Sequence, residues 1–221
     1  MFKDWNELQE SNKIVFFGNE IVYTNNTLTP RLETENLITG ILPILDTVDT
    51  VIDVGTWSGC IILGIARRAP HLQCYATELS SLAFSVAQYN IWNYNFPIKL
   101  MYGSLALPVL KSLLLWSRIL IVANLPYIPS GIKLPSDVIN QDPALALFWG
   151  GVDGLNIVRT LIEELRIYKN TFYITLALEL FEWQVTSIQS EYLSMIDNFR
   201  SWNDVCWVKR FCSFTFLHET S

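Results

Sequence analysis

The sequence is poor in the residues that commonly bind metal ions. Its 221 residues include two histidines and four cysteines, and none of the cysteines form a C-x-x-C pair. Structural zinc sites draw their ligands from closely spaced cysteine and histidine pairs, so we expect no metal site. Cys60 and Cys74 have apolar neighbours, which predicts buried, reduced thiols of the kind found in cytoplasmic proteins.

Long hydrophobic runs are also missing. The most apolar stretch, residues 113–122, is interrupted by Arg118 and is too short to span ~30 Å of hydrocarbon. Residues 1–7 carry acidic side chains and lack the apolar core of a signal peptide. We therefore expect a cytoplasmic protein with no membrane contact.

Charged residues are scarce, at 16% of the chain, and the net charge is −6. Intrinsically disordered chains are rich in charge and poor in apolar residues, whereas this chain is 51% hydrophobic. A negative balance is unsuited to long contacts with a phosphate backbone, so we expect no direct contact with nucleic acid. The length is that of one domain with a small addition.

What the chain does contain is an alternation of short apolar segments and helical patterns. We expect a helix at 33–45, strands at 48–54, 72–77, 98–102, 117–123 and 171–178, helices at 61–68, 80–92, 107–115, 153–166 and 182–195, and two β-rich runs around Lys209-Arg210 within 204–216. This order predicts an α/β fold, a Rossmann-like doubly wound and mostly parallel sheet with an antiparallel C-terminal hairpin. Residues 1–32 would form a lead-in, either a β-hairpin or a linker, and residues 33–221 the main domain.

A glycine-containing loop, Asp53-Val-Gly-Thr-Trp-Ser-Gly59, follows the expected strand at 48–54. Glycines let the backbone approach a ligand, and such loops lie at the ligand-binding edge of a doubly wound sheet. Glu78 ends the next strand, where a carboxylate can accept hydrogen bonds from ribose hydroxyls. Glu78 could instead be an acid that only favours the start of a helix. The loop and the acid together favour a nucleoside cofactor.

The fourth expected strand ends in Asn124-Leu125-Pro126-Tyr127. Asparagine and proline are ordinary turn residues. The functional alternative is an acceptor site for a planar NH2 group, which is a poor nucleophile because its lone pair is delocalised. An asparagine oxygen and a nearby carbonyl can accept its N–H bonds, and an aromatic ring can stack on it. Such a site acts through orientation and electrostatics.

Four segments resemble the release-factor glutamine methyltransferases, which have the class I S-adenosylmethionine-dependent fold. Residues 28–35 are similar to P-R-P-E-T-E, residues 53–59 to D-x-G-T-G-S-G, residues 124–127 to N-P-P-Y, and residues 142–155 to E-P-x-x-A-L-x-G-G-x-D-G-L. The N-P-P-Y motif is shared with DNA adenine methyltransferases, so the first and last segments discriminate between the two groups.

The resemblance implies S-adenosylmethionine-dependent N5-methylation of a glutamine in the Gly-Gly-Gln loop of a class I peptide-chain release factor, by a monomeric enzyme. It implies a cofactor site made of Asp53, Gly55, Thr56, Trp57, Ser58, Gly59, Glu78, Ser104, Leu105 and Asn124. It implies a substrate site made of Asn124, Leu125, Pro126 and Tyr127, with Asn124, Pro126 and Tyr127 as the catalytic residues.

The chain departs from the family pattern at several positions. Trp57 replaces the middle glycine of the loop, where a bulky residue needs a negative φ or stores strain, and its ring could narrow the cleft or point aside. Ser104 stands where the family has an acid for the adenine, and Leu125 replaces a proline. The family's C-terminal D-x-A-G-x-x-R stretch is not visible around residues 208–215, and its N-terminal helical domain is expected to be absent.

These departures keep two alternatives open. One is an N6-adenine methyltransferase of DNA or RNA, which uses the same planar NH2 acceptor. The other is a catalytically silent protein that retains the methyltransferase fold for binding a partner.

Overall fold

The structure is a computed structural model that describes residues 11–133, 142–143 and 149–218. Its centre is a seven-stranded sheet with the strand order β5-β4-β3-β6-β7-β9-β8. The strands are β3 (Thr50–Val54), β4 (Gln73–Glu78), β5 (Ile98–Tyr102), β6 (Arg118–Ala123), β7 (Tyr173–Glu179), β8 (Ile196–Asn203) and β9 (Lys209–Phe216). Neighbours pair in parallel from β5 to β7, and β9 pairs antiparallel with both β7 and β8. This confirms the predicted fold class.

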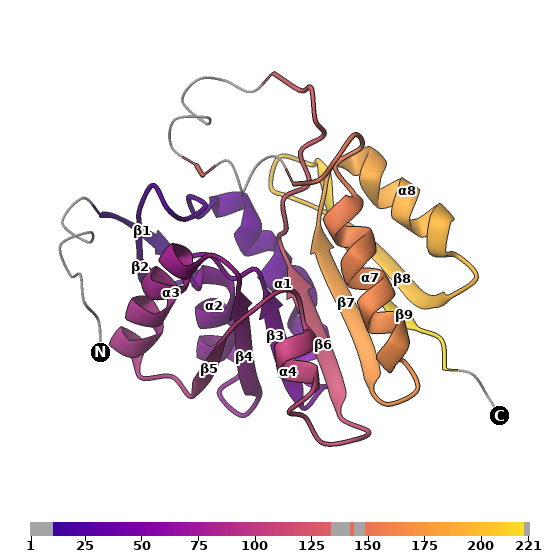
Figure 1. Ribbon diagram of the computed structural model, residues 1–221, viewed down its shortest axis with the longest axis horizontal. Helices are drawn as coiled ribbons and strands as arrows, with labels where there is room; N and C mark the ends of the chain where they lie inside the picture. The colour runs from indigo at the N-terminus through magenta and orange to yellow at the C-terminus, as the bar shows by residue number, and fades with distance from the viewer. Residues whose placement is uncertain (1–10, 134–141, 144–148, 219–221) are drawn as a thin grey trace.

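Helices cover both faces of the sheet (Figure 1). One face carries α1 (Glu35–Leu45), α2 (Cys60–Arg68) and α3 (Ser81–Tyr94), and the other carries α4 (Leu107–Leu110), α7 (Asn156–Tyr168) and α8 (Glu182–Tyr192). A 3-10 turn, η2 (Leu32–Thr34), leads into α1. Because both faces are covered, the central strands β3 and β6 are buried nearly throughout.

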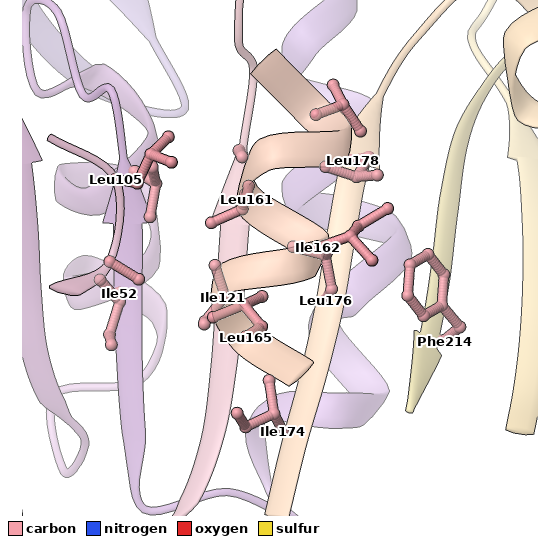
Figure 2. Packing of buried hydrophobic residues seen from close by; sticks show 14 of the residues in the cluster. Ile52, Leu105, Ile121, Leu161, Ile162, Leu165, Ile174, Leu176, Leu178 and Phe214 are labelled. Atoms are coloured by element: carbon pink, nitrogen blue, oxygen red, sulfur yellow. The ribbon is translucent and has the colours of Figure 1, made fainter. Parts of the chain in front are cut away.

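The larger core lies under α7 and α8. Figure 2 shows α7 against β6 and β7, with its apolar side chains directed at the sheet. The residues of this core that Figure 2 labels are Ile52, Leu105, Ile121, Leu161, Ile162, Leu165, Ile174, Leu176, Leu178 and Phe214. This packing fixes the C-terminal ends of β6 and β7 beside each other.

A separate hairpin precedes the sheet. It consists of β1 (Asn12–Phe16) and β2 (Asn19–Tyr23), and it packs on α2 and α3. Asn90 of α3 holds both the N–H and the carbonyl of Val22, at 3.0 and 2.7 Å. The first described residues are therefore attached to the helices next to the glycine loop.

Several predicted boundaries were wrong, and the helix expected from residue 153, for example, begins at Asn156. The helix expected at 107–115 ends at Leu110, because the N–H groups of Ser112 and Leu113 bond to carbonyls three residues back and so form turns in place of a further α-helical turn. The helix expected at 182–195 ends at Tyr192, and the polar segment that follows is the edge strand β8, which has too little buried surface to show an apolar pattern. The last hairpin turns at 204–208 and not around Lys209-Arg210.

Among the described residues, every helix is too short or too polar to cross a bilayer.

Candidate functional site

A cavity of about 410 Å³ opens at the C-terminal ends of β3, β4 and β6. Seven of the predicted site residues line it, and these are Gly55, Trp57, Glu78, Ser104, Leu105, Leu125 and Pro126. The other lining residues are mostly apolar and include Leu79, Tyr102, Trp149 and Ile157. A cavity of this kind suits a flat, largely apolar ligand with a few polar groups at its edge.

A smaller cavity of about 20 Å³ lies on the other side of the same loop. It shares Gly55 and Trp57 with the larger one and adds the predicted residues Thr56, Ser58 and Asn124. The loop after β3 therefore separates the larger cavity from the region around Asn124.

Glu78 is almost fully buried at the edge of the larger cavity. Its Oε1 accepts hydrogen bonds from the backbone N–H groups of Leu79 and Ser80, both at 2.8 Å, and its Oε2 accepts one from Trp57 at 2.9 Å. Burial raises the pKa of Glu78, and these N–H donors oppose that shift. Each carboxylate oxygen has two lone pairs, so Oε2 retains capacity for a ligand hydroxyl.

Asp53 and Gly59 line neither cavity and instead hold the backbone of the loop in place. Asp53 is fully buried, and its Oδ2 accepts the hydroxyl of Thr56 at 2.5 Å, while Oδ1 has no hydrogen-bond partner among the described residues. Burial raises the pKa of Asp53 to about 7. Gly59 precedes α2 with a φ of 81°. Both residues therefore contribute to the conformation of the loop without contacting either cavity.

Trp57 adopts the left-handed conformation that the family's glycine would take without strain. Its φ is 53°, so the alternative of a negative φ is wrong for this chain. The side chain is 9% exposed and packs against Ala83 and Leu28. Because Trp57 lines both cavities, this residue lies at the boundary between them.

Asn124 is buried where β6 ends. Its Nδ2 donates to Oε2 of Glu179 at 3.0 Å and to the hydroxyl of Thr34 at 3.4 Å. Glu179, the last residue of β7, was missed by the sequence analysis although an acid at a strand end was the signal used for Glu78. Burial raises the pKa of Glu179 to about 7.

Tyr127 points at the same carboxylate. Its hydroxyl donates to Oε1 of Glu179 at 3.4 Å, and its ring meets Phe181 edge to face at 5.1 Å. Burial, followed by the charge of Glu179, raises the pKa of Tyr127, so the phenol stays protonated. The structure thus brings Asn124 and Tyr127 together on a residue from the neighbouring strand.

Gln184 holds the backbone of this loop and was also missed. Its Nε2 donates to the carbonyls of Tyr127 and Asp153, both at 2.8 Å, and its Oε1 accepts from the N–H of Phe181. Gly154 packs so closely that a Cβ there would overlap the carbonyl oxygen of Tyr127. The Asp153-Gly154 turn therefore precedes α7 and also supports Tyr127.

The first and last segments of the sequence pattern meet in space. The guanidinium of Arg31 bonds to Asp142 at 2.5 Å, and the N–H of Thr29 donates to the same carboxylate at 2.9 Å. Asp142 is 4% exposed. Residues 144–148 of the last segment lie outside the described residues.

An acid and an arginine with the spacing of the family's C-terminal stretch, which is not visible around residues 208–215, begin earlier in the chain. Asp204 and Arg210 have the spacing of D-x-A-G-x-x-R, and Arg210 Nε donates to Asp204 Oδ2 at 2.6 Å. Trp207 occupies the glycine position of that pattern with a φ of 63°. The pattern is not visible around residues 208–215 because it begins earlier, at Asp204.

Comparison with curated proteins identifies relatives over most of the chain. The release factor glutamine methyltransferase of Geobacter sulfurreducens is 34% identical over 157 residues, which are 70% of this chain and 54% of that protein. The one from Moorella thermoacetica is 37% identical over 153 residues, 66% of this chain and 52% of that protein. The chain thus spans about half the length of the curated relatives it matches. No protein-family model matches it.

Solved structures show the same fold. The human METTL16 catalytic domain, solved with the MAT2A 3'UTR hairpin 6, has a TM-score of 0.67 at 15% identity, covering 93% of this chain and 78% of that one. The N-terminal domain of human METTL16 with SAH has a TM-score of 0.63 at 15% identity, covering 91% of this chain and 77% of that one. At this identity the likeness is one of fold.

Proposed function

Since the chain is a homologue of the release factor glutamine methyltransferases over about two thirds of its length, we propose that it methylates N5 of a glutamine in a class I peptide-chain release factor, within the Gly-Gly-Gln loop. The methyl donor is S-adenosylmethionine. The protein acts as a monomer in the cytoplasm, where release factors meet the ribosome.

One observation carries this proposal. Asn124 lies at the end of β6 with its NH2 bound to Glu179, which leaves the amide oxygen to accept an N–H from a substrate amide. A carboxamide nitrogen is a weak nucleophile, and holding its N–H bonds in the plane of the amide directs its electron density toward a methyl group. The carbonyls of the Leu125-Pro126 segment supply the second acceptor, and Tyr127 supplies the ring beside it.

The residues around the larger cavity fit the proposed cofactor. Glu78 Oε2 retains a lone pair for a ribose hydroxyl, and the walls from Leu79, Leu105 and Ile157 suit an adenine ring. Ser104 offers a hydroxyl in the same cavity. S-adenosylmethionine supplies an electrophilic methyl group when bound. The chain's own residues contribute orientation and the exclusion of water.

A second candidate function is supported by Trp57. Trp57 lines both cavities at a position where the sequence pattern has glycine, and a closed passage between the cavities would leave a protein that binds partners without transferring methyl groups. N6-methylation of adenine is a weaker alternative, because the net charge of −6 opposes binding to a phosphate backbone.

Methylation of a purified release factor tests the proposal. The chain is incubated with S-adenosylmethionine and either a class I release factor or its variant with alanine for the Gly-Gly-Gln glutamine, and the loop peptide is analysed by mass spectrometry. We expect one added methyl group on the glutamine-containing loop alone, and none with Asn124→Ala. Methylation of adenine-containing oligonucleotides in place of the release factor would contradict the proposal.

Calorimetry separates the enzyme from the silent protein. We expect S-adenosylmethionine to bind the wild type, and Glu78→Ala to weaken binding by at least about ten-fold, or ~1.4 kcal/mol. A folded wild-type chain that binds no cofactor would leave the silent protein as the better interpretation.

A further inference from the structure

We propose that Glu179 is a positioning residue, whose carboxylate fixes the Asn124 amide so that its oxygen faces the substrate amide. The inference rests on the proposed function and assigns a task to a residue from a different strand. Glu179 lines neither cavity, so it acts through the side chains it holds.

The sheet places Glu179 beside the acceptor loop. Strands β6 and β7 are parallel, with Ala123 opposite Leu178, so Asn124 and Glu179 are the next residues in register. Glu179 is 4% exposed. Its Oε2 accepts from Asn124 at 3.0 Å, and its Oε1 accepts from the hydroxyl of Tyr127 at 3.4 Å. One carboxylate therefore holds both polar side chains of the acceptor loop.

The charge state of Glu179 determines which end of the Asn124 amide faces it. An ionised carboxylate can only accept hydrogen bonds, so it requires the NH2 end of the amide. Turning the amide over would place Oδ1 against a carboxylate oxygen, and two acceptors with no proton between them repel each other strongly in a buried site. The flipped amide would also offer the substrate NH2 group a donor where it needs an acceptor.

Protonation removes this discrimination, because a neutral carboxyl can donate to Oδ1. Burial is the largest influence on Glu179 and raises its pKa to about 7. The hydroxyls of Thr34 and Tyr127 and the charge of Arg210 on β9 oppose that shift, and Glu33 of η2 adds to it. Cys60 of α2 is a further titratable neighbour, and burial raises its own pKa to about 12, so it stays neutral near pH 7.

Two substitutions separate the positioning role from simple packing. Glu179→Gln keeps an acceptor for Asn124 but cannot ionise, whereas Glu179→Met has similar length and no acceptor. Glu164 provides the matched control, because it is a partly buried carboxylate that accepts the N–H of Ala106 away from this loop. Its Gln and Met variants should leave the acceptor loop unchanged.

The test follows the side-chain NH2 of Asn124 by ¹H–¹⁵N NMR, assigned by its loss in Asn124→Asp, from about pH 5 to about pH 8. We expect a titration with a midpoint near 7 in the wild type and in Glu164→Gln, and none in Glu179→Gln. Tyr127→Phe removes a donor to the carboxylate, so its midpoint should rise. This variant also serves if the Glu179 variants fail to fold. A titration that persists in Glu179→Gln, or a midpoint unmoved in Tyr127→Phe, would overturn the inference.

Activity supplies the second readout. We expect kcat for glutamine methylation to fall at least ten-fold in Glu179→Met, with the cofactor Kd within two-fold of wild type. In Glu179→Gln, whose neutral amide can donate to Oδ1 of Asn124 as a protonated carboxyl does, kcat should fall to the low-pH level of the wild type and no longer change with pH. An unchanged kcat in Glu179→Met would overturn the inference. A wild-type chain that methylates no glutamine would count against the proposed function alone, since the NMR titration needs no activity.

Discussion

The backbone N–H of Trp57 donates to Oε2 of Glu78 at 2.9 Å, which joins the loop after β3 to the end of β4. Trp57 makes this bond with a φ of 53°, and it lines both cavities. The backbone of Trp57 therefore supports the proposed cofactor site, and we expect its side chain to restrict that site.

We expect the removal of the Trp57 ring to strengthen cofactor binding. Trp57→Ala removes the ring but keeps a Cβ, and Trp57→Gly also relieves the left-handed backbone, which costs a non-glycine residue about 1 kcal/mol. Both variants should bind S-adenosylmethionine at least about five-fold more tightly by calorimetry, near 1 kcal/mol. The glycine variant should be the more stable of the two in urea. Weaker binding in both variants would show that the ring contacts the cofactor.

The sequence predicts the parts of this structure whose signal is local. Strands β3 and β6 are buried nearly throughout and read as apolar runs, whereas β8 is a polar edge strand and gives no such signal. The loop after β3 and the Asn124 loop are likewise recognisable as continuous motifs. The sequence therefore predicts the strands and loops whose signal lies within a few consecutive residues.

Residues that act across the sheet could not be found in this way. Glu179 and Gln184 reach the acceptor loop from 55 and 57 residues away, and Arg31 reaches Asp142 from 111 residues away. Their roles depend on which strands become neighbours, and a single sequence shows that only indirectly. The C-terminal pattern was not recognised in the sequence because Trp207 occupies its glycine position.

The bond between Arg31 and Asp142 should stabilise the fold. The Asp142 side chain is fully buried and the Arg31 side chain is 38% exposed, so removing the arginine strands a buried carboxylate. We expect Arg31→Ala to lower the free energy of unfolding by about 2 kcal/mol, less than for a fully buried pair. Urea unfolding measures this. Lys13→Ala, which breaks an exposed ion pair with Glu20, is the control and should change little. Equal losses in the free energy of unfolding in Arg31→Ala and Lys13→Ala would show that the buried pair contributes no more to stability than the exposed one.

Stability should fall as pH rises toward neutrality. The pKa of buried Asp53 is raised to about 7 from an ordinary value near 3.8, so the folded protein holds a proton that the unfolded chain has lost. The free energy of unfolding therefore falls as the pH rises from about 4 to about 7. Glu179 contributes in the same direction, because its pKa is also raised to about 7.

Asp53→Asn tests this pH dependence, because the amide cannot ionise. Urea unfolding at about pH 5 and about pH 8 should show a smaller loss of stability in this variant than in the wild type, with the remainder due to the other carboxyl groups whose pKa burial raises, which include Glu179 and Glu78. Asp153→Asn is the control: Arg159 lowers the pKa of Asp153, so its substitution should act equally at both pH values. An unchanged slope in Asp53→Asn would contradict the prediction.

Gly154 should be far less tolerant of a side chain than Gly131. Both have positive φ, at 76° and 98°, so alanine strains the backbone at either position by about 1 kcal/mol. A Cβ at Gly154 would also overlap the carbonyl oxygen of Tyr127 and press on Gln184, whereas a Cβ at Gly131 meets no described atom within 4 Å. We expect Gly154→Ala to lower the free energy of unfolding by at least about 3 kcal/mol and Gly131→Ala by about 1 kcal/mol.

The same pair of variants tests whether the support of Tyr127 matters for the reaction. Displacement of its carbonyl moves the loop that carries Asn124, so Gly154→Ala should lose at least ten-fold in glutamine methylation at a temperature where it is still folded by circular dichroism. Gly131→Ala should keep its rate. Equal losses in the two variants, in stability or in rate, would mean that backbone strain alone accounts for both and that the contact between Gly154 and Tyr127 contributes nothing.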